Sequence, residues 1–265
     1  MIRALFSLRA PYPSRMIPYF ELREIPIAGG RSLSVFGTLV ALGIFAGAWF
    51  AEGRARRMGL PEREIPGAIL SAVVPGLIVA HLVALLPAGV ANWTPRTLLQ
   101  FWNGMSSFGG FTGALLGLTF YYGRSRRSWL PTVDILVQAL VIGWVFGRLG
   151  CTLVHDHIGR PSDFVLAVRF PDGPRHDLGL YEFLYTIAVL VPAVVILNRR
   201  PRPPGTSVAV LALLYAPVRF LLDFLRQTDL PGADARYLGL TMAQYGCIVL
   251  AGIGLALLMR SRRPV

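Results

Sequence analysis

The chain contains no lysine, only two cysteines and few charged residues of any kind. Its 265 residues are 54% hydrophobic and 15% charged, whereas soluble globular domains are about 25% charged. The two cysteines, Cys151 and Cys247, are too few for the disulfide framework of a small secreted domain. The low charge content therefore excludes an ordinary soluble domain and favours a membrane protein.

The hydrophobic residues form continuous runs, several of which approach the ~20 residues that a helix needs to cross hydrocarbon. A transmembrane β-barrel would instead show alternating apolar and polar positions. We therefore expect an all-α fold, a polytopic membrane bundle of about seven helices. The predicted spans cover residues 34–51, 66–86, 104–122, 133–150, 180–198, 206–225 and 241–259.

Residues 1–33 precede the first span and hold five arginines among proline, tyrosine and isoleucine. They lack the apolar core of a cleavable signal peptide, so we expect an external or interfacial segment. Residues 34–265 then form one membrane domain, in which the polar, proline-containing stretch 151–179 is an external loop.

The net charge of +12 comes from 26 arginines against 14 acidic residues. Arginine clusters follow every second predicted span, at 54–57, 124–127, 199–202 and 260–263. Because cytoplasmic loops carry the excess of positive charge, this alternation predicts an external amino end and a cytoplasmic carboxyl end. Arginines beside apolar runs suit anionic membrane lipids, so we expect no nucleic-acid partner.

The segment 146–160 joins the end of the fourth span to the loop and concentrates reactive side chains. Its members are Arg148, Cys151, His155, Asp156, His157, Gly159 and Arg160. An arginine inside a membrane costs about 2.5–3.5 kcal/mol at mid-helix. Two interpretations stay open, a basic rim anchored at lipid headgroups or a binding site for an anionic headgroup.

The sixth predicted span carries Arg219, Asp223 and Arg226, spaced four and three residues apart on one helical face. One carboxylate cannot neutralise two arginines. With Arg148 on the same side, the sequence predicts a surplus of positive charge that a lipid phosphate would satisfy. The alternative is that Arg219 and Asp223 form a pair that locks two helices together.

Glycines recur every fourth residue at Gly109, Gly113 and Gly117, a spacing typical of tight helix packing. The polar stretch 103–110 before them also resembles a shaped entrance to the bundle. Zinc accepts thiol, imidazole and carboxylate ligands, but the spacing of these groups in segment 146–160 fits no standard zinc site. We expect neither a metal nor a cofactor.

Five motifs together resemble the bacterial phosphatidylglycerol–prolipoprotein diacylglyceryl transferases over roughly residues 34–260. They are Gly104-Met105-Ser106 with Gly109-Gly110, Gly147-Arg148-Leu149-Gly150 with Gly159-Arg160, Tyr181-Glu182, Arg219-Phe220 with Asp223-Phe224-Leu225-Arg226, and Gly239-Leu240-Thr241-Met242.

The resemblance implies transfer of diacylglycerol from phosphatidylglycerol to the lipobox cysteine of a prolipoprotein, in the bacterial inner membrane. The expected partners are this lipid, the lipobox segment and membrane lipids. It implies that Arg148 and Arg219 bind the headgroup. The predicted catalytic set is Arg148, Arg219, His155 and Asp156; the predicted substrate-binding set is Gly109, Gly110, Gly159, Arg160, Asp223, Arg226, Cys151 and His157.

The sequence also departs from the family pattern. Phe108 replaces a histidine, Cys151 an asparagine and Phe36 a tyrosine. Ionisation of the substrate thiol would then need His155, His157 or Asp156. We favour His155, because a helix continuing past Gly150 would place it on the same face as Cys151. The alternative function is a catalytically altered paralogue that binds anionic lipid or lipoproteins.

Overall fold

The computed structural model describes residues 16–86, 89, 93–100, 105–123, 129–230 and 233–261. Residues 1–15 of the predicted amino-terminal segment, the arginines at 124–127 and 262–263, and residues 103 and 104 of the predicted entrance lie outside the described residues.

The chain is mostly helical. The helices are α1 (Val35–Arg57), α2 (Glu64–Leu85), α3 (Pro95–Leu99), α4 (Ser107–Gly123), α5 (Leu130–Val154), α6 (Leu178–Tyr185), α7 (Val191–Asn198), α8 (Thr206–Leu222) and α9 (Met242–Ser261), with a π-helical segment η3 (Thr186–Leu190) and a 3-10 turn η4 (Asp223–Leu225). Among the described residues, six helical segments are long and apolar enough to cross a membrane: α1, α2, α5, α6 through α7, α8 with η4, and α9. The third predicted span corresponds to α4, which has 17 residues.

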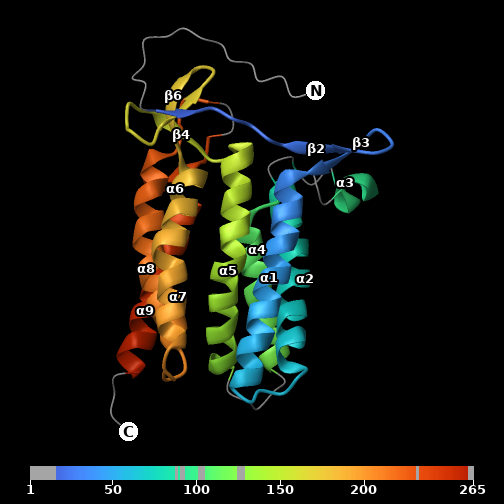
Figure 1. Ribbon diagram of the computed structural model, residues 1–265, viewed down its shortest axis with the longest axis vertical. Helices are drawn as coiled ribbons and strands as arrows, with labels where there is room; N and C mark the ends of the chain where they lie inside the picture. The colour runs from blue at the N-terminus through green and yellow to red at the C-terminus, as the bar shows by residue number, and fades with distance from the viewer. Residues whose placement is uncertain are drawn as a thin grey trace.

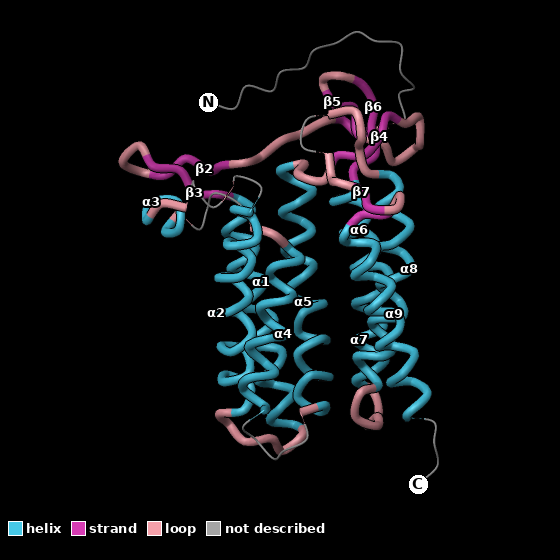
Figure 2. Tube along the Cα trace, turned by 180° about the vertical axis from the view of Figure 1, so that it is seen from behind, coloured by secondary structure: helices cyan, strands magenta, loops and turns pink. Residues whose placement is uncertain are grey.

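Short strands, which the sequence did not predict, cover one end of this mostly helical bundle. A four-stranded sheet has the order β1 (Ile17–Pro18), β5 (Val168–Phe170), β6 (Gly173–Asp177) and β4 (Ile158–Pro161), and β1 runs parallel to β5. Two hairpins lie at the same end. One pairs β2 (Glu24–Ile27) with β3 (Arg31–Ser34) (Figure 1), and the other pairs β7 (Arg236–Tyr237), labelled in Figure 2, with β8 (Leu240–Thr241). The loop 155–177 contains three prolines. Proline inside a helix removes a backbone hydrogen bond, so this segment folds as strands.

The arginine-rich helix ends gather at the opposite end of the bundle. Arg54, Arg56 and Arg57 lie in the last turn of α1, and Arg260 lies in the last turn of α9. Residues 199–202 follow α7 at that end as well (Figure 2). The described parts of three predicted arginine clusters thus share one end, away from the sheet.

Small residues set the closest helix contacts. A Cβ atom on Gly117 of α4 would lie 1.7 Å from the carbonyl oxygen of Ser71 in α2. Pro75 has no N–H to bond that carbonyl within α2, so the bare glycine of α4 packs against it. Gly43 of α1 also packs closely against Gly143 of α5, since a hypothetical Cβ on Gly43 would lie 2.6 Å from the Gly143 carbonyl oxygen. The packing interpretation of the glycine row is therefore the one that the structure shows.

The fifth span is not one regular helix. Pro192 lacks the N–H that would bond the carbonyl of residue 188. Immediately before it the chain forms η3, whose following residue Val191 donates its N–H to the carbonyl of Thr186, five residues back. The Thr186 hydroxyl also donates to the carbonyl oxygen of Glu182 at 2.6 Å. The irregular turn thus begins four residues, about one helical turn, after Glu182, and such turns are frequent at functional sites.

Candidate functional site

Four charged side chains form a buried chain where α5, α6 and α8 meet below the sheet. Glu182 of α6 lies between two arginines, 2.8 Å from Nη2 of Arg148 and 3.3 Å from Nε of Arg219. Arg219 also pairs with Asp223 at 2.6 Å. Arg148, Glu182 and Asp223 are 6%, 2% and 0% exposed. These two arginines and two carboxylates are neutral together, and Arg226 pairs separately with Asp234. The predicted surplus of positive charge is therefore wrong, because Glu182 and Asp234 supply two carboxylates that the prediction did not count.

Two N–H donors beside these four charged side chains have no hydrogen-bond acceptor. The Arg148 guanidinium lies 4.5 Å from the centre of the Trp144 ring, a cation–π contact. Among the described residues, Nε of Arg148 and Nε1 of Trp144 are buried without a hydrogen-bond partner. Buried donors are rarely left unpaired in proteins. The site therefore offers free N–H groups beside a buried guanidinium, which suits an anionic oxygen acceptor.

Asp223 holds the Arg219 side chain in place. One of its carboxylate oxygens pairs with Arg219, and the other accepts a hydrogen bond from the Thr241 hydroxyl. Gln244 holds Thr241 in turn, because its side-chain oxygen accepts from the Thr241 N–H at 3.0 Å. Both oxygens of Asp223 are thus engaged by the protein. The structure places this predicted substrate-binding residue as a support for Arg219.

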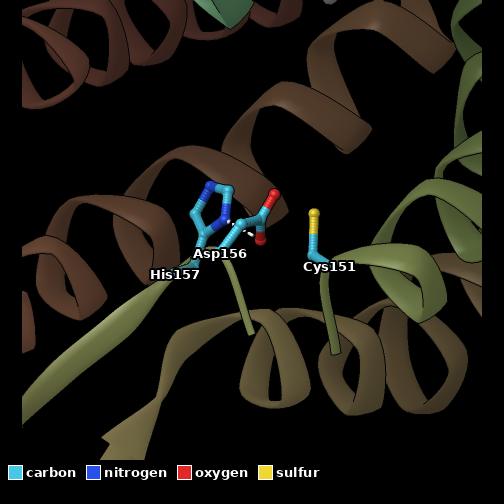
Figure 3. A group of neighbouring side chains, drawn as sticks. All are labelled: Cys151, Asp156 and His157. Carbon is cyan, nitrogen blue, oxygen red and sulfur yellow. Dashed lines mark hydrogen bonds and ion pairs between the residues drawn. The ribbon is translucent and has the colours of Figure 1, made fainter. Parts of the chain in front are cut away.

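A second group contains Cys151, Asp156 and His157, whose side chains converge at the end of α5 (Figure 3). One ligand atom from each lies within 4.8 Å of the others. Nδ1 of His157 is 2.5 Å from Oδ1 of Asp156. Nη1 of Arg148 lies 3.4 Å from Nε2 of His157 and 3.7 Å from the Cys151 sulfur. The arginine therefore joins this group to the buried ion chain.

The three donors are of the types that zinc accepts. However, the Arg148 guanidinium, itself a cation, contacts both the sulfur and the imidazole nitrogen that a metal would need. This arrangement favours proton handling over metal binding. Burial raises the pKa of Asp156, but the hydrogen bond from His157 and the nearby charge of Arg148 lower that pKa by more, so it lies below its usual value.

His155 does not belong to this group, which corrects the prediction that it shares a face with Cys151. The helix α5 ends at Val154, and His155 adopts a left-handed conformation with φ of 52°. Its Nδ1 lies 2.5 Å from Oδ2 of Asp177, and its Nε2 lies 2.9 Å from the carbonyl oxygen of Phe20. His155 therefore fastens the amino-terminal segment and the start of α6 to the end of α5. This reversal of the backbone is also what brings Asp156 and His157 to one side.

Both partners of His155 accept hydrogen bonds, so both of its ring nitrogens donate and the ring is an imidazolium. Burial lowers the pKa of His155, but the hydrogen bond and the charge of Asp177 raise it by more. The other oxygen of Asp177 accepts from the Leu180 N–H at 3.0 Å and caps α6. The two residues thus form a structural lock at the edge of the site.

The remaining predicted residues make other contacts. Gly159 pairs with Arg226 through a β-bridge, and a Cβ on Gly159 would lie 2.7 Å from the carbonyl oxygen of Leu225. The Arg226 guanidinium pairs with Asp234, and Arg160 is exposed. Gly109 and Gly110 belong to the packing face of α4, where a Cβ on Gly109 would lie 2.7 Å from the carbonyl oxygen of Val79.

Sequence reasoning missed Glu182, Tyr215 and Trp144 as site residues. The Tyr215 hydroxyl donates to Glu182 at 3.2 Å, and Trp144 packs on Arg148. A signal for Glu182 was present, since an acidic residue within an apolar span usually has a function. Trp144 lies four residues before Arg148, and Tyr215 four before Arg219, each one helical turn away.

Known proteins are similar to this one along almost the whole chain. Residues 25–260 match the family model described as prolipoprotein diacylglyceryl transferase. The phosphatidylglycerol–prolipoprotein diacylglyceryl transferase of Nitratidesulfovibrio vulgaris is 31% identical over 256 residues, which cover 93% of this chain and 97% of that protein. Proteins of the same name from Pseudomonas putida and Azotobacter vinelandii are 29% and 30% identical, over 94% and 91% of this chain and 98% and 95% of their own lengths.

Proposed function

The chain belongs to the prolipoprotein diacylglyceryl transferase family, and we propose that it transfers diacylglycerol from phosphatidylglycerol to the cysteine thiol of a prolipoprotein lipobox. One observation carries this proposal. Buried Arg148 and partly buried Arg219 share one carboxylate, and Arg148 keeps an unpaired N–H beside the unpaired indole N–H of Trp144. A phosphate diester is an anion with free oxygen acceptors, and guanidinium groups bind it through paired hydrogen bonds.

The reaction is a displacement at carbon. The thiolate sulfur attacks the glycerol carbon that bears the phosphate, the new S–C bond forms, and the C–O bond breaks with its electron pair passing to the departing glycerol phosphate. Negative charge increases on that phosphate in the transition state. Arginines held in place by Glu182 and Asp223 stabilise this charge without having to reorganise.

A second candidate function is a lipid- or lipoprotein-binding protein without turnover. Phe108, which cannot accept a proton, stands where the family pattern has a histidine, and this favours the second function. An assay of diacylglyceryl transfer from phosphatidylglycerol to a lipobox peptide distinguishes the two functions. A protein that only binds would retain phosphatidylglycerol but release no glycerol phosphate.

We also propose the membrane arrangement. The helix α4 is the seventh span, since 17 residues at 1.5 Å each reach about 25 Å. The arginine-rich end faces the cytoplasm of a bacterial cell and the sheet faces outward. Reporter fusions after residues 60 and 170 should then report the inside and the outside, respectively. Reports from the same side would contradict this topology.

The binding test compares arginines at the two ends of the bundle. Arg219→Ala should weaken binding of phosphatidylglycerol about 10- to 150-fold, because a hydrogen bond to a charged group contributes about 1.5–3 kcal/mol. Arg202→Ala is the matched control, since Arg202 is exposed after α7, and it should leave binding unchanged. Arg219→Lys should recover only part of the affinity, because an ammonium cannot form the two-pronged contact. Equal binding by Arg219→Ala and the parent would remove Arg219 from the site.

A further inference from the structure

We propose that His157 is the general base that accepts the proton of the substrate thiol, and that Asp156 positions its imidazole ring; this inference rests on the proposed transferase function. The first observation is the orientation of the ring. Nδ1 of His157 lies 2.5 Å from Oδ1 of Asp156. An ionised carboxylate only accepts hydrogen bonds, so Nδ1 carries a hydrogen. A guanidinium only donates, so Nε2, which faces Nη1 of Arg148, carries the electron pair. A base held by a third group in this way is the arrangement of nucleophile-activating sites in general.

The second observation is where that electron pair points. Nε2 of His157 lies 3.4 Å from Nη1 of Arg148, the guanidinium assigned above to the lipid phosphate. The same Nη1 is 3.7 Å from the sulfur of Cys151. The chain therefore already holds one thiol beside this nitrogen and this arginine. A substrate thiol that attacks a lipid bound at Arg148 must come close to the same nitrogen.

The contact with Arg148 also couples the base to the lipid. Without a phosphate, the guanidinium donates toward Nε2 and occupies its electron pair. A phosphate that reaches from the unpaired Nε of Arg148 to Nη1 competes with His157 for the Nη1 hydrogens, because oxyanions are the stronger acceptors. Binding of the lipid then uncovers Nε2, so the base becomes available when the electrophile is in place.

The other candidate bases in the described part of the chain are already committed elsewhere. Both ring nitrogens of His155 donate, to Asp177 and to the carbonyl of Phe20. Nδ1 of His176 bonds the Tyr181 hydroxyl at 2.9 Å. The two buried carboxylates near the site hold the arginines. His157 alone among the described histidines directs a ring nitrogen at the phosphate-binding arginine.

The proton is accounted for at each step. Nε2 takes the thiol proton as the S–C bond forms, and the resulting imidazolium is stabilised by Asp156. It then passes the proton to the departing glycerol phosphate or to water. The His157 side chain is 20% exposed, so it reaches solvent, whereas Arg148 is buried.

The test measures transfer of labelled diacylglyceryl from phosphatidylglycerol vesicles to a lipobox peptide by the full-length protein. His157→Ala should lower the rate about 100- to 10,000-fold, the usual contribution of a general base. Asp156→Asn should lower it about 10- to 100-fold, the effect of losing a charged hydrogen bond. His176→Gln is the matched control and should keep the parent rate.

Three further readouts separate a base from a merely structural residue. Added imidazole should restore part of the His157→Ala rate. The pH profile of the rate should also differ between the parent and His157→Ala. A selenocysteine peptide, whose selenol is already ionised at neutral pH, should react nearly equally with parent and variant.

An active parent with an unaffected His157→Ala variant would overturn the assignment of His157. So would an equal loss on thiol and selenol peptides without rescue by imidazole, which would indicate a structural role. A parent inactive on both peptides would instead overturn the transferase function, and this inference with it.

Discussion

Replacing Glu182 by glutamine should destabilise the protein strongly, because this buried carboxylate lies between the guanidinium groups of Arg148 and Arg219. The parent has two positive and two negative charges in the chain Arg148, Glu182, Arg219 and Asp223. Glutamine keeps the shape but leaves one positive charge without a partner. It also loses the acceptor of the 3.2 Å bond from the Tyr215 hydroxyl, unless its amide oxygen takes that place.

The expected loss follows from the burial. Removing one partner of a buried ion pair costs about 3–5 kcal/mol, and Glu182 is 2% exposed. For a chain of this size, 1 kcal/mol corresponds to about 2–4 °C in the melting temperature. Glu182→Gln should therefore melt about 6–20 °C below the parent in detergent micelles. The double variant Glu182→Gln, Arg148→Met should lose less than the sum of the single variants, because it restores neutrality.

The matched control is Glu52→Gln. Glu52 pairs with Arg56 at 3.9 Å on the exposed surface, and such pairs contribute about 0–1 kcal/mol. Melting is followed by the fluorescence of a thiol-reactive dye or by loss of soluble protein after heating. A Glu182→Gln variant that melts within about 2 °C of Glu52→Gln would refute the argument that the ion chain is neutral and mutually supporting.

Two other features lead to direct tests. Gly117→Ala should separate α4 from α2 and lower the melting temperature, because its Cβ would lie 1.7 Å from the Ser71 carbonyl oxygen. Gly123→Ala in the same helix is the control and should leave the melting temperature unchanged, because its Cβ would meet no atom within 4 Å. Equal melting temperatures of the two variants would contradict the packing of α4 on α2. The contact of His155 with Asp177 and Phe20 should weaken as the pH rises, because the pKa of His155 is raised in the folded state. Its contribution to stability is complete below the pKa in the unfolded chain, about 6.5, and is lost as the pH passes the pKa in the folded protein. Hydrogen exchange at residues 16–22 should therefore quicken at alkaline pH in the parent but depend less on pH in His155→Gln, and an equal pH dependence in both would exclude the lock.

Much of the bundle was predictable from the sequence alone. Continuous apolar runs located the membrane helices within a few residues, because crossing hydrocarbon requires about 20 apolar positions in a row. The glycine spacing on α4 predicted close packing, since that need depends on the helical period alone. Motifs such as Gly147-Arg148-Leu149-Gly150 and Tyr181-Glu182 carried the resemblance to the family that the comparisons then confirmed.

What the tertiary structure decided was which charged groups meet. The pairing of Glu182 with both Arg148 and Arg219 joins three helices that are far apart in sequence, and no local spacing reports such a contact. The left-handed turn at His155 is likewise invisible in a helical pattern. It directs His155 to Asp177 and the carbonyl of Phe20, and it leaves His157 beside Arg148. Local periodicity therefore specified the helices, while the partner of each buried charge depended on long-range packing.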